Sequence, residues 1–433
     1  MILRPSSKTS RAALSRRAFA VRDEYTPCRN QTRYERDTKI PSEQPNPKRS
    51  PRLLLNPVLA ELPAYPLVRM DERRRDLEER GAKLFDFGTG DPREPTDKKI
   101  RQALIDGVLE VSRYPSATGT KELREAFVNF MLRRHSVRLD PETEVLPAAG
   151  SKEAIFHAPL AFIHPVHERR GISYGTPGYP VYERGALFAG GEALPVKLRK
   201  EEGFLLPVRD IDPARTRAVW VNYPHNPTGA TATLQYIEEL ANFCREHDIL
   251  LFSDECYNDV YSGDPPPSVL EITKERTLAF VSLSKRSGMT GYRSAMMAGD
   301  PELIAALKKL RPSIGAASPG FVQQAATAAW TDDAHVNERN RTFAAKRALF
   351  ESFLERAGFR YTSTNASLYL WVEVPKEYGG DDEAYAVRLL DERIIVAPGS
   401  SFGPGGEGYF RIALVPAIQE CEEAIARWEG LTE

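Results

Sequence analysis

Short apolar runs alternate with amphipathic stretches along most of the chain. Apolar runs of strand length lie at residues 171–174, 193–197, 218–222, 249–254, 278–283 and 293–298, and helical periodicity marks 98–110, 120–134 and 151–162. The run at 249–252 is apolar at every position, which is typical of a strand buried on both faces. This alternation predicts an α/β fold in which helices cover a mostly parallel sheet and the strand ends meet at one edge.

The flanking regions predict a second, smaller domain of α+β type. Helical patterns at 301–311 and 320–330 lead into a long helix at 332–358, and strands are expected at 368–374, 394–397 and 409–414 before a last helix at 417–431. Residues 53–80 also read as helical, followed by a short strand at 83–87. We therefore expect a large domain at 96–315 and a small domain built from 53–95 and 316–433.

Composition narrows the class of protein. The 433 residues carry 59 Lys and Arg against 60 Asp and Glu, so the formal net charge is −1 and nothing calls for nucleic acid or a membrane surface. The four cysteines are scattered without metal-ligand spacing or a disulfide framework, which favours a reducing, cytoplasmic location. No metal site is expected, and no apolar run is long enough to span a bilayer.

Residues 1–52 have a different character. They hold thirteen Lys or Arg against five acidic residues and sustain no apolar period, which predicts a disordered basic tail. Its acid-free start resembles an organelle transit peptide, and Ser15–Phe19 superficially resembles a twin-arginine signal, although an apolar export core is missing. A misassigned translation start explains the segment equally well.

Chemically distinctive side chains follow the ends of three predicted strands. Lys285 comes two residues after the strand 278–283, with Ser282 before it and Arg293 eight residues later. A fixed, partly desolvated amine beside hydroxyls and a cation suits a Schiff base to a phosphorylated aldehyde. Taken alone, however, a Ser-x-x-Lys sequence is most often a surface lysine in a loop.

The two neighbouring strand ends supply further parts of such a site. Asp254 ends the buried strand, where a carboxylate is costly unless it meets a cation such as a protonated pyridine nitrogen. Tyr257 and the carboxamide of Asn226 are then placed to reach a ring oxygen. Each feature has an ordinary explanation as a helix cap or turn residue, but their ordered combination has few.

As a set, these motifs resemble the class I/II aminotransferases of fold type I, which depend on pyridoxal 5′-phosphate, from about Leu53 to the C-terminus. The resemblance implies that Lys285 carries the cofactor, that Asp254 pairs with the pyridine nitrogen and that Tyr257 and Asn226 hold the ring O3′. It makes residues 96–315 the cofactor-binding domain. The remaining implied cofactor contacts are stacking by Tyr179 and phosphate binding by Gly150, Ser151, Lys152, Ser282 and Arg293.

Further segments extend the resemblance to the substrate and to a second subunit. Arg113–Arg124 resembles the loop in which a tyrosine, here Tyr114, reaches the phosphate of the neighbouring subunit, which implies a homodimer with shared sites. Pro398–Leu414 resembles the stretch that carries the arginine for the substrate α-carboxylate, here Arg411, a task suited to a guanidinium. Gly90 fits the loop whose backbone covers the substrate, and Asn226 is expected to contact it as well.

The implied reaction moves an amino group between an amino acid, with glutamate as one partner, and a 2-oxo acid. Ser284–Ser287, Asp254–Tyr261 and Asn56–Pro66 are similar to succinyldiaminopimelate aminotransferases of lysine biosynthesis. Arg286 either holds a distal substrate carboxylate or points to solvent. Diaminopimelate, aromatic or alanine transamination stays open, as does a β-eliminating lyase that shares the cofactor residues. A transcription regulator would need a helix-turn-helix module, for which the tail is too short.

Overall fold

The computed structural model describes residues 55–61 and 68–432. The predicted disordered tail and the leader or translation-start alternatives for residues 1–52 lie outside the described residues, so they stay predictions. Within the described ranges, no helix is both long and apolar enough to cross a bilayer.

Helices and strands are interspersed along the described part of the chain. The helices are α1 Pro57–Glu61, α2 Val68–Glu79, α3 Lys98–Asp106, α4 Lys121–His135, α5 Ser151–Phe162, α6 Val181–Phe188, α7 Leu234–Glu246, α8 Leu283–Arg286, α9 Pro301–Ile314, α10 Gly320–Thr331, α11 Ala334–Arg356, α12 Asp382–Asp391 and α13 Ile418–Thr432. The strands are β1 Phe85–Asp86, β2 Val145–Ala148, β3 Gly171–Thr176, β4 Glu192–Lys197, β5 Thr216–Asn222, β6 Leu250–Asp254, β7 Thr277–Ser282, β8 Ala295–Gly299, β9 Tyr361–Thr362, β10 Tyr369–Glu373, β11 Ile394–Ile395, β12 Ala397–Pro398 and β13 Tyr409–Ala413.

A seven-stranded sheet forms the centre of the fold, in the order β2-β8-β7-β6-β5-β3-β4. The strands β7, β6, β5, β3 and β4 pair in parallel, and β8 runs antiparallel to both of its neighbours. This confirms the predicted mostly parallel, helix-covered α/β sheet. In the register, Asn222 lies beside Asp254 and Asp254 beside Phe280, so the carboxyl ends of β5, β6 and β7 meet at one edge.

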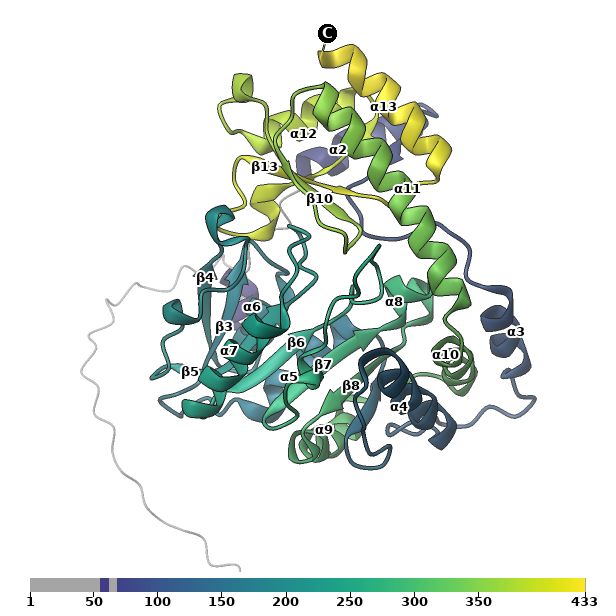
Figure 1. The fold of residues 1–433 in the computed structure, drawn as a ribbon, viewed down its shortest axis with the longest axis vertical. Helices are drawn as coiled ribbons and strands as arrows, with labels where there is room; N and C mark the ends of the chain where they lie inside the picture. Colours follow the sequence, from purple (N-terminus) through teal and green to yellow (C-terminus); the bar gives the residue numbers. More distant parts are fainter. Residues whose placement is uncertain (1–54, 62–67, 433) are drawn as a thin grey trace, which may run out of the picture. The chain divides into compact units, whose positions relative to one another are not determined.

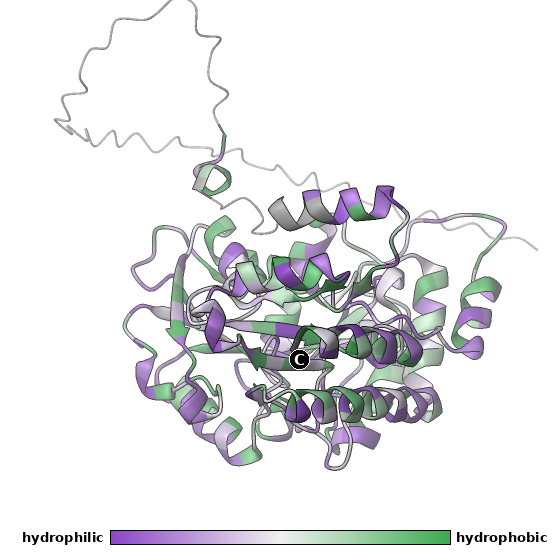
Figure 2. Ribbon diagram, turned by 90° about the horizontal axis from the view of Figure 1, so that it is seen from above, coloured by the Kyte–Doolittle hydropathy of each residue, from purple (hydrophilic) through white to green (hydrophobic). Residues whose placement is uncertain are grey.

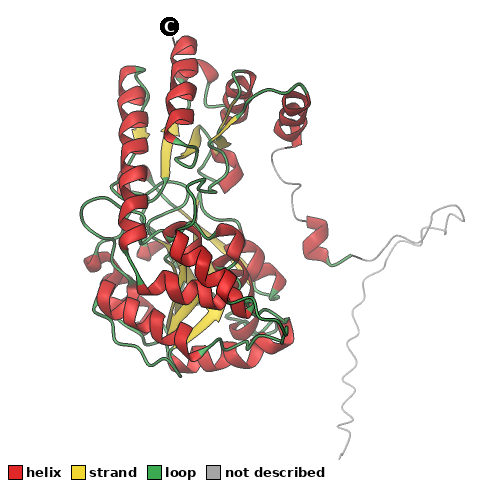
Figure 3. Cartoon of the chain, turned by 90° about the vertical axis from the view of Figure 1, so that its right-hand side faces the viewer, coloured by secondary structure: helices red, strands yellow, loops and turns green. Residues whose placement is uncertain are grey.

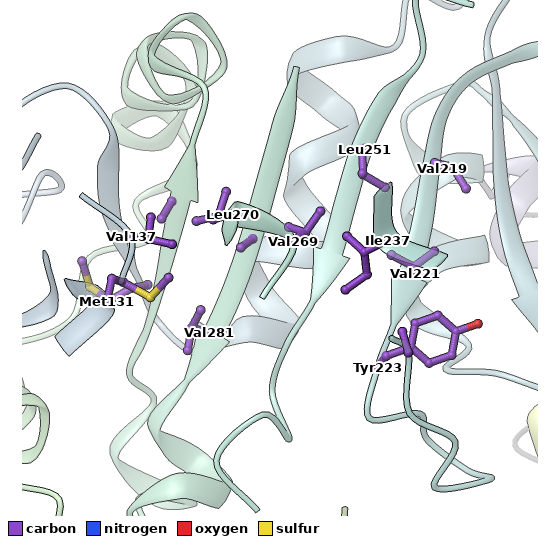
Figure 4. Packing of buried hydrophobic residues seen from close by; sticks show 14 of the residues in the cluster. Met131, Val137, Val219, Val221, Tyr223, Ile237, Leu251, Val269, Leu270 and Val281 are labelled. Atoms are coloured by element: carbon purple, nitrogen blue, oxygen red, sulfur yellow. The ribbon is translucent and has the colours of Figure 1, made fainter. Parts of the chain in front are cut away.

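The central strands bury side chains on both faces, as their uninterrupted apolar sequences predict. Alternate residues point to opposite cores: Val219 and Val221 of β5 join a cluster under α4, α7 and α10, whereas Trp220 joins a cluster under α5, α6 and α9. Figure 4 shows part of the first cluster, with Leu251 near these valines and Val281 on a more distant strand. Helices lie on either side of the yellow strands in Figure 3, and in Figure 2 they alternate hydrophilic and hydrophobic segments.

A second, antiparallel sheet has the order β12-β13-β10-β9. It shares a core with α11, α12, α13 and the two-stranded parallel pair β1-β11, centred on Phe350, Leu370, Phe410 and Trp428. The long helix α11 extends from α10 towards this sheet in Figure 1. Helix α10 packs against α3 and α4 and contributes side chains to the apolar core on one face of the large sheet, so it belongs with that sheet. The domain boundaries themselves stay a prediction.

The structure adds elements that the apolar pattern does not indicate. Helix α6 forms directly after Pro180, where the sequence suggests only a proline-rich turn. The helix expected at 98–110 ends at Asp106, before Gly107, and leaves an irregular segment up to α4. The strand expected from Arg293 starts instead at Ala295, because Arg293 has a left-handed backbone with φ of 56°.

Candidate active site

A cavity of about 960 Å³ opens at the carboxyl edge of the large sheet, against β10, β13 and the turn 399–404. Its wall contains nearly all of the residues singled out from the sequence. Those lining it are Gly90, Ser151, Lys152, Tyr179, Asn226, Asp254, Tyr257, Ser282, Lys285, Arg293 and Arg411. Of the other two, Gly150 lies against the Arg293 guanidinium, and Tyr114 lies outside the cavity wall with a fully exposed side chain.

Asp254 is a buried carboxylate at the end of β6, with 4% of its surface exposed. It accepts hydrogen bonds from the Tyr182 phenol (2.8 Å) and from the Cys256 backbone N–H (3.2 Å), both neutral donors. Burial raises the pKa of Asp254, and these hydrogen bonds partly oppose the rise. A carboxylate in this position is completed by a cation in the cavity, which is the role expected for a protonated pyridine nitrogen.

Lys285 lies in the four-residue helix α8, just after the end of β7. Its amine donates a hydrogen bond to the carbonyl oxygen of Gly90 from the loop on the opposite wall. Removal from water lowers the pKa of Lys285 to about 8, and the nearby Asp91 carboxylate opposes this effect. The amine is therefore deprotonated far more readily than an ordinary lysine, as a nucleophile or base requires.

The loop before α5 forms a cradle for an anion. Gly150 has φ of 92° and no side chain that could cap α5. The first-turn N–H groups of α5 are therefore left for an acceptor in the cavity. A Cβ at this glycine would collide with Nη2 of Arg293, so only glycine lets the guanidinium pack against the loop. Ser282 Oγ accepts from the Ser284 N–H at 3.1 Å and keeps its own proton to donate.

Arg411 is held rigidly on β13 at the other side of the cavity. Nη1 donates to Asn226 Oδ1 at 2.7 Å and Nη2 to the Gly88 carbonyl at 2.5 Å, while the guanidinium lies 4.2 Å from the Tyr369 ring centroid. Its Nε is buried and makes no hydrogen bond within the described part of the chain. Since Asn226 Oδ1 accepts from Arg411, the amide Nδ2 is left as the donor to an oxygen in the cavity.

Arg286, next to the catalytic candidate, contradicts both expectations from the sequence. It is only 2% exposed and is absent from the cavity wall. Nε donates to Asp259 at 2.8 Å and Nη1 to the Ala329 carbonyl at 2.7 Å, and the guanidinium lies against the neighbouring rings of Phe130 and Trp330. Arg286 thus neither points to solvent nor is available to a substrate carboxylate; it anchors α8 from behind.

Three residues that the sequence did not single out belong to the same arrangement. Tyr182 bonds Asp254, and Tyr369 Oη lies 2.9 Å from Tyr257 Oη. Asn222 donates from Nδ2 to the Asp254 carbonyl and accepts from the Asn226 N–H, so it ties two site residues together. Tyr182 could have been found from its position three residues after Tyr179, which places both on one side of a helical turn; Tyr369 has no comparable local signal.

The donor set matches a phosphorylated pyridine aldehyde. The cavity presents an amine with a lowered pKa, a buried carboxylate with neutral partners, phenol and amide groups, and a glycine-floored cradle with an arginine. Among the described residues, no group of three His, Cys, Asp or Glu side chains is arranged to hold a metal ion. The residues therefore fit the cofactor expected from the sequence.

Comparisons with known proteins agree with this chemistry. The profile of the family "Aminotransferase class I and II" matches residues 82–427. An LL-diaminopimelate aminotransferase from Aquifex aeolicus (strain VF5) is 36% identical over 380 residues, covering 86% of this chain and 97% of the relative.

Solved structures show the same fold. An aminotransferase from Neisseria meningitidis Z2491 has a TM-score of 0.81 at 32% identity and covers 88% of this chain and all of the other. A probable N-succinyldiaminopimelate aminotransferase from Thermus thermophilus has a TM-score of 0.77 at 29% identity, covering 83% and 98% of the two chains. The protein belongs to the class I/II aminotransferases, enzymes that depend on pyridoxal 5′-phosphate.

Proposed function

We propose that the cavity binds pyridoxal 5′-phosphate through Lys285 and that the residues around it have the roles implied by the sequence. The proposal rests on one observation: Lys285 and Asp254 line the same cavity beside the anion cradle. The two residues come from the ends of adjacent parallel strands. Asp254 would face the ring nitrogen, Tyr257 and Asn226 the ring O3′, and Tyr179 the ring face. The phosphate would lie at Gly150, Ser151, Lys152, Ser282 and Arg293.

The bound cofactor supplies an electron sink for the electrons released at the substrate Cα. The rest of the chemistry falls to side chains of this chain. Arg411 holds the substrate α-carboxylate through two parallel bonds and thereby orients the Cα–H bond, with Gly90 and Asn226 closing over the substrate. Lys285, set free when the substrate amine takes its place, accepts the Cα proton; its pKa of about 8 suits a base near neutral pH.

We further propose that the amino acid pair is glutamate and a member of the diaminopimelate series. The relative from Aquifex aeolicus is described as acting on LL-diaminopimelate, and the Thermus thermophilus structure as acting on the N-succinyl derivative. Glu183 and Arg184 of α6 both line the cavity. The carboxylate of Glu183 suits the distal ammonium of LL-diaminopimelate, and the guanidinium of Arg184 suits its distal carboxylate. Glu183 would repel the additional negative charge of the succinyl derivative.

A half-reaction with single amino donors tests this function. Purified yellow protein should lose the absorbance of the aldehyde form of the cofactor with glutamate and with LL-diaminopimelate, and less with the N-succinyl derivative, alanine or aromatic amino acids. Glu183→Gln should raise KM for LL-diaminopimelate about tenfold more than KM for glutamate, since a charge-assisted contact is lost. Release of pyruvate and ammonia from a cystathionine-like substrate would instead identify a β-eliminating lyase.

We also propose a homodimer in which Tyr114 of each subunit completes the phosphate site of the other. The end of α3 and the segment that follows it expose Ile105, Val108, Leu109 and Val111, each at least 61% exposed, near the fully exposed Tyr114. Such a run of apolar side chains is unusual on a free surface and marks an interface.

The shared site can be tested by mixing two inactive variants. Subunits with Lys285→Ala still supply Tyr114, and subunits with Tyr114→Ala still supply Lys285. Refolding the two together should create one intact site per mixed dimer and restore activity above that of either variant. A mixture that stays inactive would refute shared sites, and a monomeric mass in sedimentation would refute the dimer.

A further inference from the structure

The proposed function gives no role to Tyr182, which donates a hydrogen bond to Asp254. The phenol oxygen lies 2.8 Å from Asp254 Oδ2, and both residues are buried, with 3% and 4% of their surfaces exposed. The other carboxylate oxygen, Oδ1, accepts the Cys256 backbone N–H, and the Cys256 thiol also helps to lower the pKa of Asp254. Within the described part of the chain, Tyr182 is therefore the hydroxyl donor to this carboxylate.

The position of Tyr182 is fixed by packing around α6. Its ring stacks on Trp220 at 5.2 Å between centroids and an interplanar angle of 17°. Helix α6 can approach because Gly178 and Gly185 have no side chains: a Cβ at Gly178 would collide with the Gly175 carbonyl, and one at Gly185 would lie 3.2 Å from the Phe156 carbonyl. The phenol thus cannot swing away from Asp254 without disturbing a buried stack.

The turn that leads into α6 contains both Tyr179 and Tyr182. Tyr179 and Tyr182 are three residues apart, and their rings meet edge to face at 5.7 Å. Tyr179 lines the cavity, where we place it on the face of the cofactor ring, while Tyr182 lies against the carboxylate behind it. The same turn therefore orients the ring and the group that faces its nitrogen.

We propose that Tyr182 is a positioning residue that holds the Asp254 carboxylate as an anion, directed at the pyridine nitrogen of the cofactor. This inference rests on the proposed function of Asp254. A hydrogen bond donated to a carboxylate favours its charged form. Without it, the buried carboxyl group would take the proton from the ring nitrogen, since a neutral pair is favoured where water is excluded, and the electron sink would weaken.

The titratable groups facing Asp254 come from three elements. Tyr182 of α6 and both Cys256 and Tyr257 after β6 interact with Asp254 itself, whereas Tyr179 before α6 interacts with Tyr182 and Lys285 after β7 with Cys256. Burial raises the pKa values of the Tyr182, Tyr257 and Cys256 side chains well above their ordinary range, so these groups are neutral near physiological pH. Asp254 and the cofactor are then the groups between which the proton is divided.

Tyr182→Phe tests the proposal, because it removes the hydroxyl and keeps the ring that stacks on Trp220. With cofactor labelled with ¹⁵N in the ring, the nitrogen chemical shift reports protonation directly. We expect the variant to shift towards the unprotonated value and kcat to fall about 10- to 100-fold, the effect of one hydrogen bond to a charged group. KM for glutamate should change far less, because Arg411 and the substrate side of the cavity are untouched.

Two comparisons separate this role from a structural one. Tyr236→Phe removes a phenol that donates to the Leu206 carbonyl at 2.9 Å, away from the cavity, and should leave the ring nitrogen signal unchanged. In an Asp254→Ala background, Tyr182→Phe should add no further change in the signal, since the two act through one interaction.

The outcomes also distinguish the inference from the function beneath it. Suppose that Tyr182→Phe keeps a protonated ring nitrogen and a normal kcat, whereas Asp254→Ala loses both. This result would refute the proposed role of Tyr182 and leave the role of Asp254 intact. A nitrogen signal insensitive to Asp254→Ala would overturn the assignment of Asp254 and the inference with it. Equal further losses caused by Tyr182→Phe with and without Asp254 would show that the phenol acts elsewhere.

Discussion

Replacing Lys285 with alanine is expected to abolish the covalent attachment of the cofactor and to lower kcat by at least about 10³-fold, because the variant loses both the nucleophile and the base. The cavity wall contains one other lysine, Lys152, which is exposed and at the start of α5. In the native protein, borohydride reduction followed by peptide mapping should mark Lys285. A mark on Lys152, or on no lysine, would contradict the central assignment.

The matched control is Lys152→Ala, which should weaken phosphate binding but keep the covalent link.

The pH dependence of cofactor attachment gives a second check on Lys285. Because burial lowers the pKa of Lys285 to about 8, its amine is protonated and unreactive below that pH and becomes neutral above it. The rate at which cofactor-free protein attaches the aldehyde should therefore rise with pH and reach half its maximum near pH 8. A rise centred near the ordinary lysine value would mean that the amine lies in water.

The sequence was informative where chemistry lies at strand ends. Asp254 and Lys285 each follow a continuous apolar run, and the parallel pairing of β6 with β7 brings the carboxyl ends of these runs to one edge of the sheet. Their meeting at one edge was thus predictable from the expectation of a mostly parallel sheet. The same reasoning applies to Ser151, because a strand followed by a glycine and a helix presents free N–H groups at its start.

Residues whose role depends on distant packing were not predictable in this way. Tyr369 meets Tyr257 across 112 positions of sequence, and nothing near either residue indicates the contact. Arg286 follows Lys285 directly, yet its guanidinium turns away from the cavity because Asp259 and two aromatic rings behind α8 compensate its burial. A charged residue beside a catalytic one can therefore be structural, and only the three-dimensional arrangement of its partners decides which.

Replacing Asp254 with alanine is expected to lower kcat by about 10²- to 4 × 10³-fold, while weakened cofactor binding persists. Removing one partner of a buried charge pair costs about 3–5 kcal/mol, and each 1.4 kcal/mol is about tenfold in rate. Lys285 and the anion cradle remain, so the cofactor still attaches. The measurements are single-turnover kinetics with glutamate and equilibrium binding of the cofactor. Near-normal turnover in this variant would show that the reaction does not need the carboxylate.

The adjacent Glu255 offers a closely matched control for that experiment. It is also buried, at 3% exposure, but accepts from the Val269 N–H at 2.8 Å and the Ser253 hydroxyl at 3.0 Å, on the side away from the cavity. Burial raises the pKa of Glu255, and glutamine keeps the size of its side chain and one acceptor oxygen. Glu255→Gln should keep turnover within about threefold of the native protein, because no contact to the cavity is lost. Such a change in the activation free energy is smaller than the roughly 1.4 kcal/mol that a tenfold change in rate requires. If Glu255→Gln lost as much activity as Asp254→Ala, the effect would reflect general damage to the end of β6, because only one of these two neighbouring carboxylates faces the cavity.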